Sequence, residues 1–166
     1  MSLIVRFMAR LAWPLCLVYG LYVVLHGHLT PGGGFQGGSV MATGAALMLV
    51  SGAWSRKEEE AHERRMHGLE SLGLVGFWLL ALGGLLHGAA FFHNWLAHSG
   101  GMFGAAVAPG PNAGSLGTGG TIPPMNLAVG LEVLGGLSVI LHGFGRALRE
   151  AEGREDGERE EADDVD

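Results

Sequence analysis

Residues 11–25 read LAWPLCLVYGLYVVL and contain no charged side chain. This uncharged stretch continues through Ser55, and a second one runs from Ser71 to Leu131. Roughly a quarter of the residues in an average soluble protein are charged, whereas only 16% of this chain is. A soluble domain could not solvate surfaces built from such stretches. The sequence therefore indicates a protein embedded in a lipid bilayer.

Four apolar segments are each close to the ~20 residues that cross a bilayer core of about 30 Å. The second is the shortest and needs residues from the glycine-rich stretch before it in order to span. We expect helices because a helix satisfies its backbone polar groups where no water is available. The predicted fold class is all-α, an integral membrane protein whose four-helix domain covers residues 1–145, with spans at about 4–25, 38–54, 69–92 and 122–144.

The basic residues predict the orientation, because short loops rich in Lys and Arg stay in the cytoplasm. The connections at residues 26–37 and 93–121 contain none. No Ala-x-Ala cleavage pattern follows Leu25, so we expect the first segment to remain as an uncleaved span. All ten basic residues then lie on one side, with both termini in the cytoplasm: Arg6, Arg10, Arg56, Lys57, Arg64, Arg65, Arg146, Arg149, Arg154 and Arg159.

The net charge of −6 belongs to the end of the chain. Residues 146–166 hold four basic and ten acidic side chains, so this tail accounts for the whole net charge and the first 145 residues are neutral. We expect an acidic cytoplasmic tail that is disordered at its end. Its charge indicates nothing about a cationic substrate.

Residues 27–38 read GHLTPGGGFQGG, with six glycines among twelve residues. Glycine permits backbone angles closed to other residues and very close approach of two backbones. One interpretation is a tight re-entry of the chain into the second helix. The alternative is a helix start near Phe35 whose free N–H groups hold an anion or polarise a water molecule. His26 and His28 form at best half of a zinc site, so we predict neither a metal nor a cofactor.

The same string resembles the signature G-H-x-x-P-G-G-G-F-x-G-G of the small MnhB/MrpB-like membrane subunit of multi-subunit, Mrp-type sodium/proton antiporters. That family also occurs in membrane-bound hydrogenases and related complexes that resemble the membrane arm of respiratory complex I. The likeness covers about residues 4–145. It implies a subunit that is not itself an enzyme and that works with other membrane subunits to translocate Na+ and/or H+. The matching positions are His28, Pro31, Gly32, Gly33, Gly34, Phe35, Gly37 and Gly38.

The start of the fourth segment refines this resemblance. The antiporter subunits usually carry an acidic residue there, in a sequence like F-D-x-G-V-Y-L, where residues 125–131 of this chain read MNLAVGL. Residues 126–133, NLAVGLEV, are more similar to the version found in hydrogenase-like complexes. We therefore expect a redox-coupled assembly rather than a free-standing antiporter.

Glu132 is the charged residue in the core of an apolar segment, about ten residues or roughly 15 Å from either end. An ionised side chain there costs at least ~2.5 kcal/mol, so it is expected to face protein or water. One interpretation is a proton or cation site, since desolvation and neighbouring cations poise such a carboxyl to load and release a proton. The alternative is a protonated carboxyl that hydrogen-bonds a neighbouring helix and only stabilises the packing.

Three further side chains join Glu132 as candidates for an ion or proton route. His87, near the outer face, and His142, near the inner end, could act as relay groups on either side of Glu132. Hydrogen bonding at the membrane interface is the alternative role of both. Asn126 lies some 120° around the helix from Glu132, so the two are not expected to share one ligand.

Two other classes of function compete with the translocation subunit. One is a b-type cytochrome anchor, in which His26 or His28 pairs with His87 around a haem. The inner half of the predicted spans offers only His142, so a second haem would lack a ligand pair. The other is a stand-alone transporter, but the sequence lacks the repeated halves and interrupted helices usual in such proteins. Small helix faces such as Gly84-x-x-x-Gly88 instead favour packing against partner helices.

Overall fold

The computed structural model describes residues 2–88, 90–97, 99–107 and 114–163, with the side chains as far as residue 154. No β-strand occurs among these residues, which confirms the all-α prediction for this part of the chain. The helices are α1 (Leu3–Leu25), α2 (Gly33–Val50), α3 (Arg56–Leu86), the short 3-10 helix η1 (Leu116–Thr118) and α4 (Ile122–Asp163).

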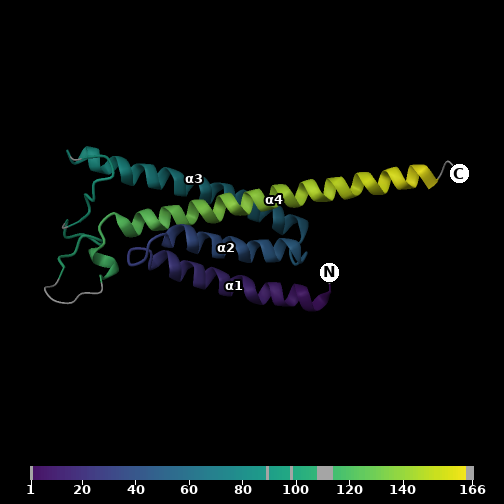
Figure 1. The fold of residues 1–166 in the computed structure, drawn as a ribbon, viewed down its shortest axis with the longest axis horizontal. Helices are drawn as coiled ribbons and strands as arrows, with labels where there is room; N and C mark the ends of the chain where they lie inside the picture. Colours follow the sequence, from purple (N-terminus) through teal and green to yellow (C-terminus); the bar gives the residue numbers. More distant parts are fainter. Residues whose placement is uncertain (1, 89, 98, 108–113, 164–166) are drawn as a thin grey trace.

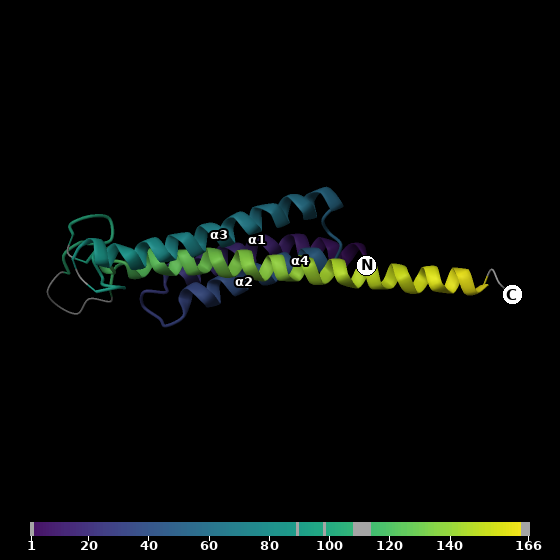
Figure 2. The ribbon, with the colours of Figure 1, turned by 90° about the horizontal axis from the view of Figure 1, so that it is seen from above.

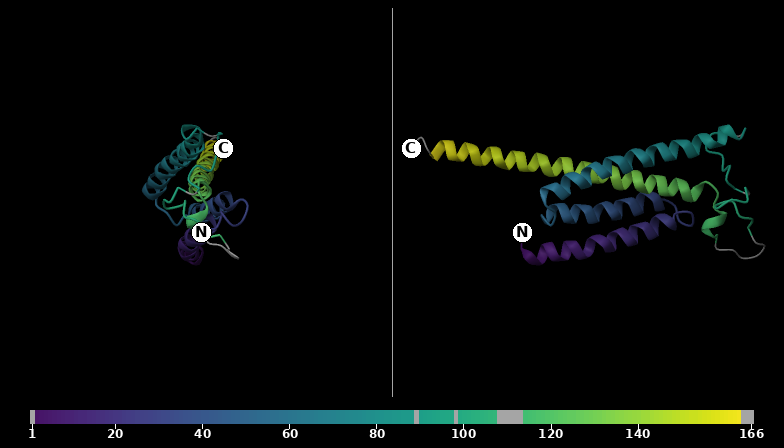
Figure 3. Two further views of the ribbon diagram at one scale, coloured as in Figure 1. Left: turned by 90° about the vertical axis from the view of Figure 1, so that its left-hand side faces the viewer. Right: turned by 180° about the vertical axis from the view of Figure 1, so that it is seen from behind.

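Successive α-helices run antiparallel and pack in the order α3, α4, α2, α1 (Figure 1). The extensive helix pairs are α1 with α2, α2 with α4 and α3 with α4. The view from above (Figure 2) and the view from behind (Figure 3, right) show that α4 continues well past the other three helices. Because the end-on view shows an open arc rather than a closed ring, α1 and α3 lie at its two edges.

Three of the helices are long and apolar enough to cross a membrane: α1, α3 and residues Ile122–Arg154 of α4. The 18-residue α2 is not among them, so a count of four spans stays a prediction. Helix α2 begins at Gly33, five residues before the predicted start, because Gly32 adopts a left-handed conformation (φ 84°) and the glycines after it are helical. The glycine-rich stretch is therefore largely the first turns of a helix.

Helices α3 and α4 both depart from their predicted ends. The charged segment after Ser55 is the start of α3, capped by reciprocal hydrogen bonds between Ser55 and Glu58. The predicted end at residue 92 is wrong, because Gly88 takes a left-handed conformation (φ 71°) that ends the helix after Leu86. Helix α4 continues through Asp163, so most of the acidic tail is helical, and disorder at its very end stays a prediction. Residues 164–166 lie outside the described part.

The extension of α4 is tied to the charged start of α3. Arg146 donates a hydrogen bond to Glu63, and Arg149 pairs with Glu59 at 3.2 Å. The arginines of both pairs are exposed, so each pair contributes little stability by itself. Together they keep α3 and α4 side by side beyond their apolar segments.

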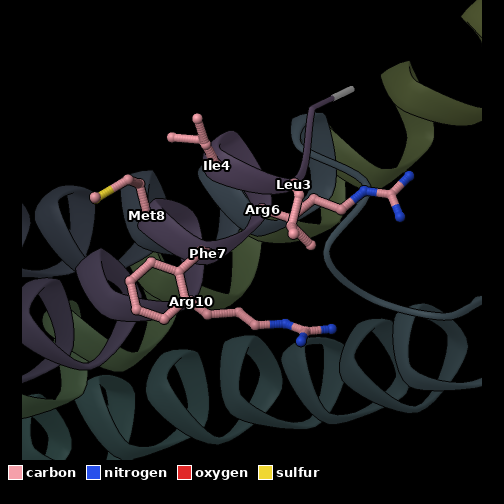
Figure 4. A pocket seen from close by; sticks show the side chains of 6 residues that line it. All are labelled: Leu3, Ile4, Arg6, Phe7, Met8 and Arg10. Atoms are coloured by element: carbon pink, nitrogen blue, oxygen red, sulfur yellow. The ribbon is translucent and has the colours of Figure 1, made fainter.

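The N-terminus of α1, the connection between α2 and α3, and the extension of α4 lie at one end of the molecule (Figure 1). We call this the basic end. Arg6 and Arg10 point from α1 toward the α2–α3 connection (Figure 4), where Arg10 donates a hydrogen bond of 2.9 Å to the carbonyl of Ala53. The positive charges are thus gathered as the positive-inside rule requires, while the side of the membrane stays a prediction.

Glycines set the distances between α2 and its two neighbours. A Cβ added to Gly20 of α1 would lie 2.6 Å from the carbonyl oxygen of Gly37. On the other side, a Cβ at Gly38 would lie 2.8 Å from the carbonyl oxygen of Gly130 in α4. Larger side chains at these positions would force the helices apart, so the glycines hold α2 between α1 and α4.

We expect Gly38→Ala to lower the free energy of unfolding by about 1–3 kcal/mol, because the added methyl group overlaps the backbone of α4. Gly143→Ala is the matched control in α4, since no atom lies within 4 Å of the added Cβ. This control should stabilise the helix by up to ~1 kcal/mol. Denaturant unfolding of the purified protein in detergent measures both values, and equal values would refute the close-packing argument.

Candidate functional site

The residues of the glycine-rich signature build the contact between the first turns of α2 and its neighbours. Gly37 faces α1, whereas Gly34 and Gly38 face α4. A Cβ on Gly34 would lie 2.7 Å from the carbonyl oxygen of Asn126. Pro31 and Phe35 are exposed on the surface of the chain. The structure therefore favours the packing role of this stretch, with the helix start as a junction of three helices.

His28 and Asn126 lie at the same end as this junction. The ring nitrogens of His28 are 3.0 Å from the carbonyl oxygen of Leu25 and 3.2 Å from that of Gly114. His28 thus links the end of α1 to the long connection before α4. The side-chain Nδ2 of Asn126 is buried and has no hydrogen-bond partner among the described residues, and it lies against Gly27.

Glu132 lies on the face of α4 that packs against α3. A Cβ added to Gly73 of α3 would be 2.6 Å from the backbone nitrogen of Glu132 and 2.9 Å from its Cβ. The side chain is half-buried. The expectation that Glu132 faces protein rather than lipid is therefore consistent with its position at the α3–α4 crossing, midway between Ile122 and His142.

A second carboxylate, Glu70 of α3, meets α4 at the same crossing. A Cβ added to Gly135 would lie 2.6 Å from the backbone nitrogen of Glu70 and 2.8 Å from its Cβ. The Glu70 Oε1 atom also faces Gly136, where an added Cβ would be 3.5 Å away. Each helix therefore packs a glutamate against a glycine of the other. The Oε2 atom of Glu70 also lies 3.7 Å from Nδ1 of His67 on the same helix, and the Glu70 side chain is 42% exposed.

Sequence reasoning missed Glu70 because it stands next to the charged start of α3. The signal was present as a short repeat: residues 68–73 read GLESLG and residues 130–135 read GLEVLG. Because α3 and α4 are antiparallel, two copies of this motif pack glutamate against glycine in both directions. The helix crossing is thus approximately symmetric, with one carboxylate from each copy.

His142 lies about ten residues from Glu132 toward the basic end and is nearly fully buried, with 4% of its surface exposed. Its Nδ1 is 2.7 Å from the carbonyl oxygen of Ser138. A carbonyl only accepts, so Nδ1 donates, and Nε2 of the neutral ring carries a lone pair. Neither this Nε2 nor the hydroxyl of the fully buried Ser138 has a hydrogen-bond partner among the described residues.

His62 of α3 stacks on His142 within an aromatic cluster at the basic end. The two ring centroids are 5.4 Å apart with an interplanar angle of 26°. Trp54 lies 4.4 Å from the His62 ring and 6.2 Å from the His142 ring, and the edge of Trp13 contacts His62 at 5.8 Å. The Nε2 atom of His62 is also buried without a partner among the described residues.

His62 stands in the charged part of α3, before the apolar segment that begins at Leu69. Burial lowers the pKa of His62 to about 4, and the adjacent His142 and the positive charge of Arg65 act in the same direction. The neutral ring is therefore the form that the folded protein favours near neutral pH.

His87 is far from the aromatic cluster at the basic end. It caps the end of α3, where its Nδ1 contacts the carbonyl of Gly83 at 2.9 Å and its ring stacks on Trp95 at 4.7 Å. The structure therefore places His142 in the cluster with His62 and Trp54, and His87 at the other end of α3. The alternative haem ligand set is not assembled either, since His28 contacts backbone carbonyls with both ring nitrogens and His87 lies on the helix at the opposite edge of the arc.

Comparison with known proteins places most of the chain in one family. A family model described as a domain related to the MnhB subunit of Na+/H+ antiporter matches residues 4–139. An uncharacterised protein of Methanocaldococcus jannaschii is 36% identical over 135 residues, which cover 81% of this chain. The chain spans about half the length of that relative, 49%. The matched range includes the signature and both carboxylates of the helix crossing.

We expect the stability of the protein to fall as the pH is lowered from about 7.5 to about 5, in part through His62. The unfolded chain takes up this proton around the ordinary pKa of 6.5, whereas the folded chain does so only near 4. Acid therefore favours unfolding across that interval, and His62→Asn should reduce the fall in Tm.

The exposed His93 provides a matched control, because its side chain lies on the surface of the described chain. Thermal unfolding of wild type, His62→Asn and His93→Asn in detergent across this pH range measures the difference. If both variants lost as much stability in acid as the wild type, the linkage to His62 would be wrong.

Proposed function

Since the chain belongs to the family of domains related to the MnhB subunit of Na+/H+ antiporters, we propose that it is a non-catalytic subunit of a multi-subunit complex that translocates Na+ and H+. It is a multi-pass protein of the cell membrane. The observation that carries the proposal is the family match over residues 4–139. The open arc of helices supports it, because an incomplete bundle leaves helix faces for other subunits.

The proposal includes four spans with both termini in the cytoplasm. At 1.5 Å per residue, the 18 residues of α2 reach about 27 Å, close to the thickness of a bilayer core. Helix α2 packs between α1 and α4 rather than lying apart from them. The clustering of arginines at the basic end supports the cytoplasmic assignment of that end.

Reporter fusions test this topology. A fluorescent protein fused after residue 166 should be fluorescent, and alkaline phosphatase inserted between residues 102 and 107 should be active, because that connection lies at the opposite end from the arginines. Alkaline phosphatase fused after residue 166 should be inactive, and a fluorescent protein inserted between residues 102 and 107 should not be fluorescent. Phosphatase activity at the C-terminus would overturn the orientation.

We propose that Glu132 is the proton or cation site of this subunit. Its support is the position of the residue in the middle of the apolar part of α4, against Gly73 of α3. An ionised side chain is energetically costly there, and residues of this kind inside membranes are usually functional. The carboxyl of Glu70 on the facing helix provides a second acceptor nearby. Two carboxyls at one crossing can share a single proton or bind a monovalent cation between them.

Glu132→Gln should leave the complex assembled and reduce Na+-dependent proton exchange about 100-fold, because the amide cannot take up a proton. Glu150→Gln, on the exposed extension of α4, is the control and should have no effect. Fluorescence quenching in inverted membrane vesicles measures the Na+-dependent proton exchange of both variants. Recovery of the purified complex measures their assembly. Normal exchange in a fully assembled Glu132→Gln complex would instead assign the carboxyl to helix packing.

We further propose that the complex is redox-coupled, on the basis of the string NLAVGLEV at residues 126–133. Purification of the tagged chain in mild detergent distinguishes the possibilities. Copurification of hydrogenase-like or other oxidoreductase subunits supports this assignment, and copurification of antiporter subunits alone refutes it while leaving the broader proposal intact.

A further inference from the structure

We propose that His62, His142, Ser138 and Glu70 form a hydrated proton route along the α3–α4 interface, from the basic end of the molecule to Glu132. This inference rests on the proposed function of Glu132 as a proton site and adds its path to the cytoplasm. It uses side chains that the family signature does not contain.

The entrance of the route is the histidine pair, which lies between two pockets at the basic end. His142 lines a pocket of about 70 Å³ together with Glu59, Glu63 and Arg146. His62 lines a second pocket of about 320 Å³, with Trp13 and Trp54 among its walls. Since a water molecule needs only about 10–15 Å³ of such volume, each pocket has room for several. Both histidines therefore line pockets large enough to hold water.

Buried polar atoms without partners indicate where water continues inward. His62 Nε2, His142 Nε2 and Ser138 Oγ are all buried and have no hydrogen-bond partner among the described residues. Leaving such an atom unsatisfied costs about 1–3 kcal/mol, and native proteins normally fill such positions with ordered water. His142 stacks on His62 of α3 and donates to the carbonyl oxygen of Ser138. The three atoms therefore belong to one group of contacting residues on α3 and α4.

From His142 and Ser138, the proposed route continues along α4 to the carboxylates of Glu70 and Glu132. Along α4, Ser138 is about 6 Å from the level of His142, the Gly135 contact with Glu70 about 10 Å, and Glu132 about 15 Å. Glu70 faces Gly135 and Gly136, whose missing side chains leave its carboxylate room beside α4. Successive groups are thus about one helical turn apart, a spacing that one bridging water molecule can close.

The proton transfer balances at each step. Nε2 of a neutral imidazole accepts a proton from a hydronium ion that reaches the pockets at the basic end, so that the hydronium becomes water and the ring becomes imidazolium. The N–H bond then breaks as water near Ser138 delivers a proton to the carboxylate of Glu70, which becomes a neutral carboxyl, and the imidazole returns to its neutral form. Transfer from Glu70 to Glu132 moves the same proton across the helix crossing.

Several charged groups face the histidine pair and influence its proton occupancy. The pocket beside His62 includes Glu58 and Arg65, and Arg10 of α1 binds the nearby carbonyl of Ala53. Beside His142, acidic and basic side chains from α3 and α4 alternate: Arg56, Glu59, Glu60, Glu63, Arg146 and Arg149. This pocket thus holds three acidic and three basic side chains, and His142 is one of the groups that lower the pKa of His62.

Cysteine accessibility in the assembled complex tests whether the route contains water. In a chain whose own Cys16 is replaced by Ser, single cysteines are placed at Ser138 and His142, and at Ile140 as the control. Ile140 is 66% exposed on the apolar surface and would face lipid or a partner, not the route. We expect Ag+ added to the cytoplasmic side to react with the first two positions and not with Ile140→Cys.

Transport measurements test whether this water carries protons. His142→Gln and the double variant with His62→Gln should lose most of the Na+-dependent proton uptake and its dependence on cytoplasmic pH, with assembly preserved. Imidazole added to a His142→Ala complex should restore part of the rate. His93→Gln, at the opposite end, should behave as wild type.

The outcomes separate this inference from the function on which it rests. If the wild-type complex exchanges no Na+ for H+, the proposed function fails whatever the labelling shows. An unreactive Ser138→Cys in an active complex overturns the route and leaves the function standing. Reactive cysteines with an unchanged pH profile in the histidine variants overturn proton conduction through it. If a histidine variant does not assemble, the labelling of the nearly isosteric Ser138→Cys decides.

Discussion

The apolar lipid around the helices is the constraint on which this structure depends. Lipid tails are as apolar as leucine, so helices in a bilayer gain little by burying apolar side chains against each other. Close van der Waals packing of the helix backbones therefore becomes the main source of helix association, and it requires residues with no side chain at the contact. Gly20 with Gly37, and Gly38 with Gly130, bring α2 into such contact with α1 and α4. The high glycine content of the chain follows from this requirement.

The same constraint makes every polar group inside the bundle significant. A carboxylate or imidazole placed between helices must be compensated by a partner, by water or by a change of protonation. Glu70 and Glu132 meet the backbones of glycines, and the inner histidines border pockets at the basic end. Polar groups thus concentrate on the α3–α4 interface, whereas the contacts of α2 with α1 consist mainly of small and apolar residues.

Prediction from the sequence was accurate where it depended on local composition. Long uncharged stretches identified the apolar helices, because insertion into lipid is a property of each segment by itself. Prediction of helix ends was less accurate. Gly32 and Gly88 adopt left-handed conformations that set the start of α2 and the end of α3, and composition alone did not show which glycines would do so. The charged start of α3 and the extension of α4 are helices that support each other through Arg146 and Arg149.

The sequence by itself determined that the chain is helical, that it enters the membrane and that its positive charges fall into three groups. It also determined that Glu132 is a charged residue in the core of an apolar segment. Each of these follows from residue types within one segment. Only the tertiary structure decided that Glu70 faces α4 beside Glu132, that His62 stacks on His142, and that His87 stands apart. Those residues are up to eighty positions apart in the chain, and their proximity depends on the register between antiparallel helices, which is set by where glycines allow two backbones to touch.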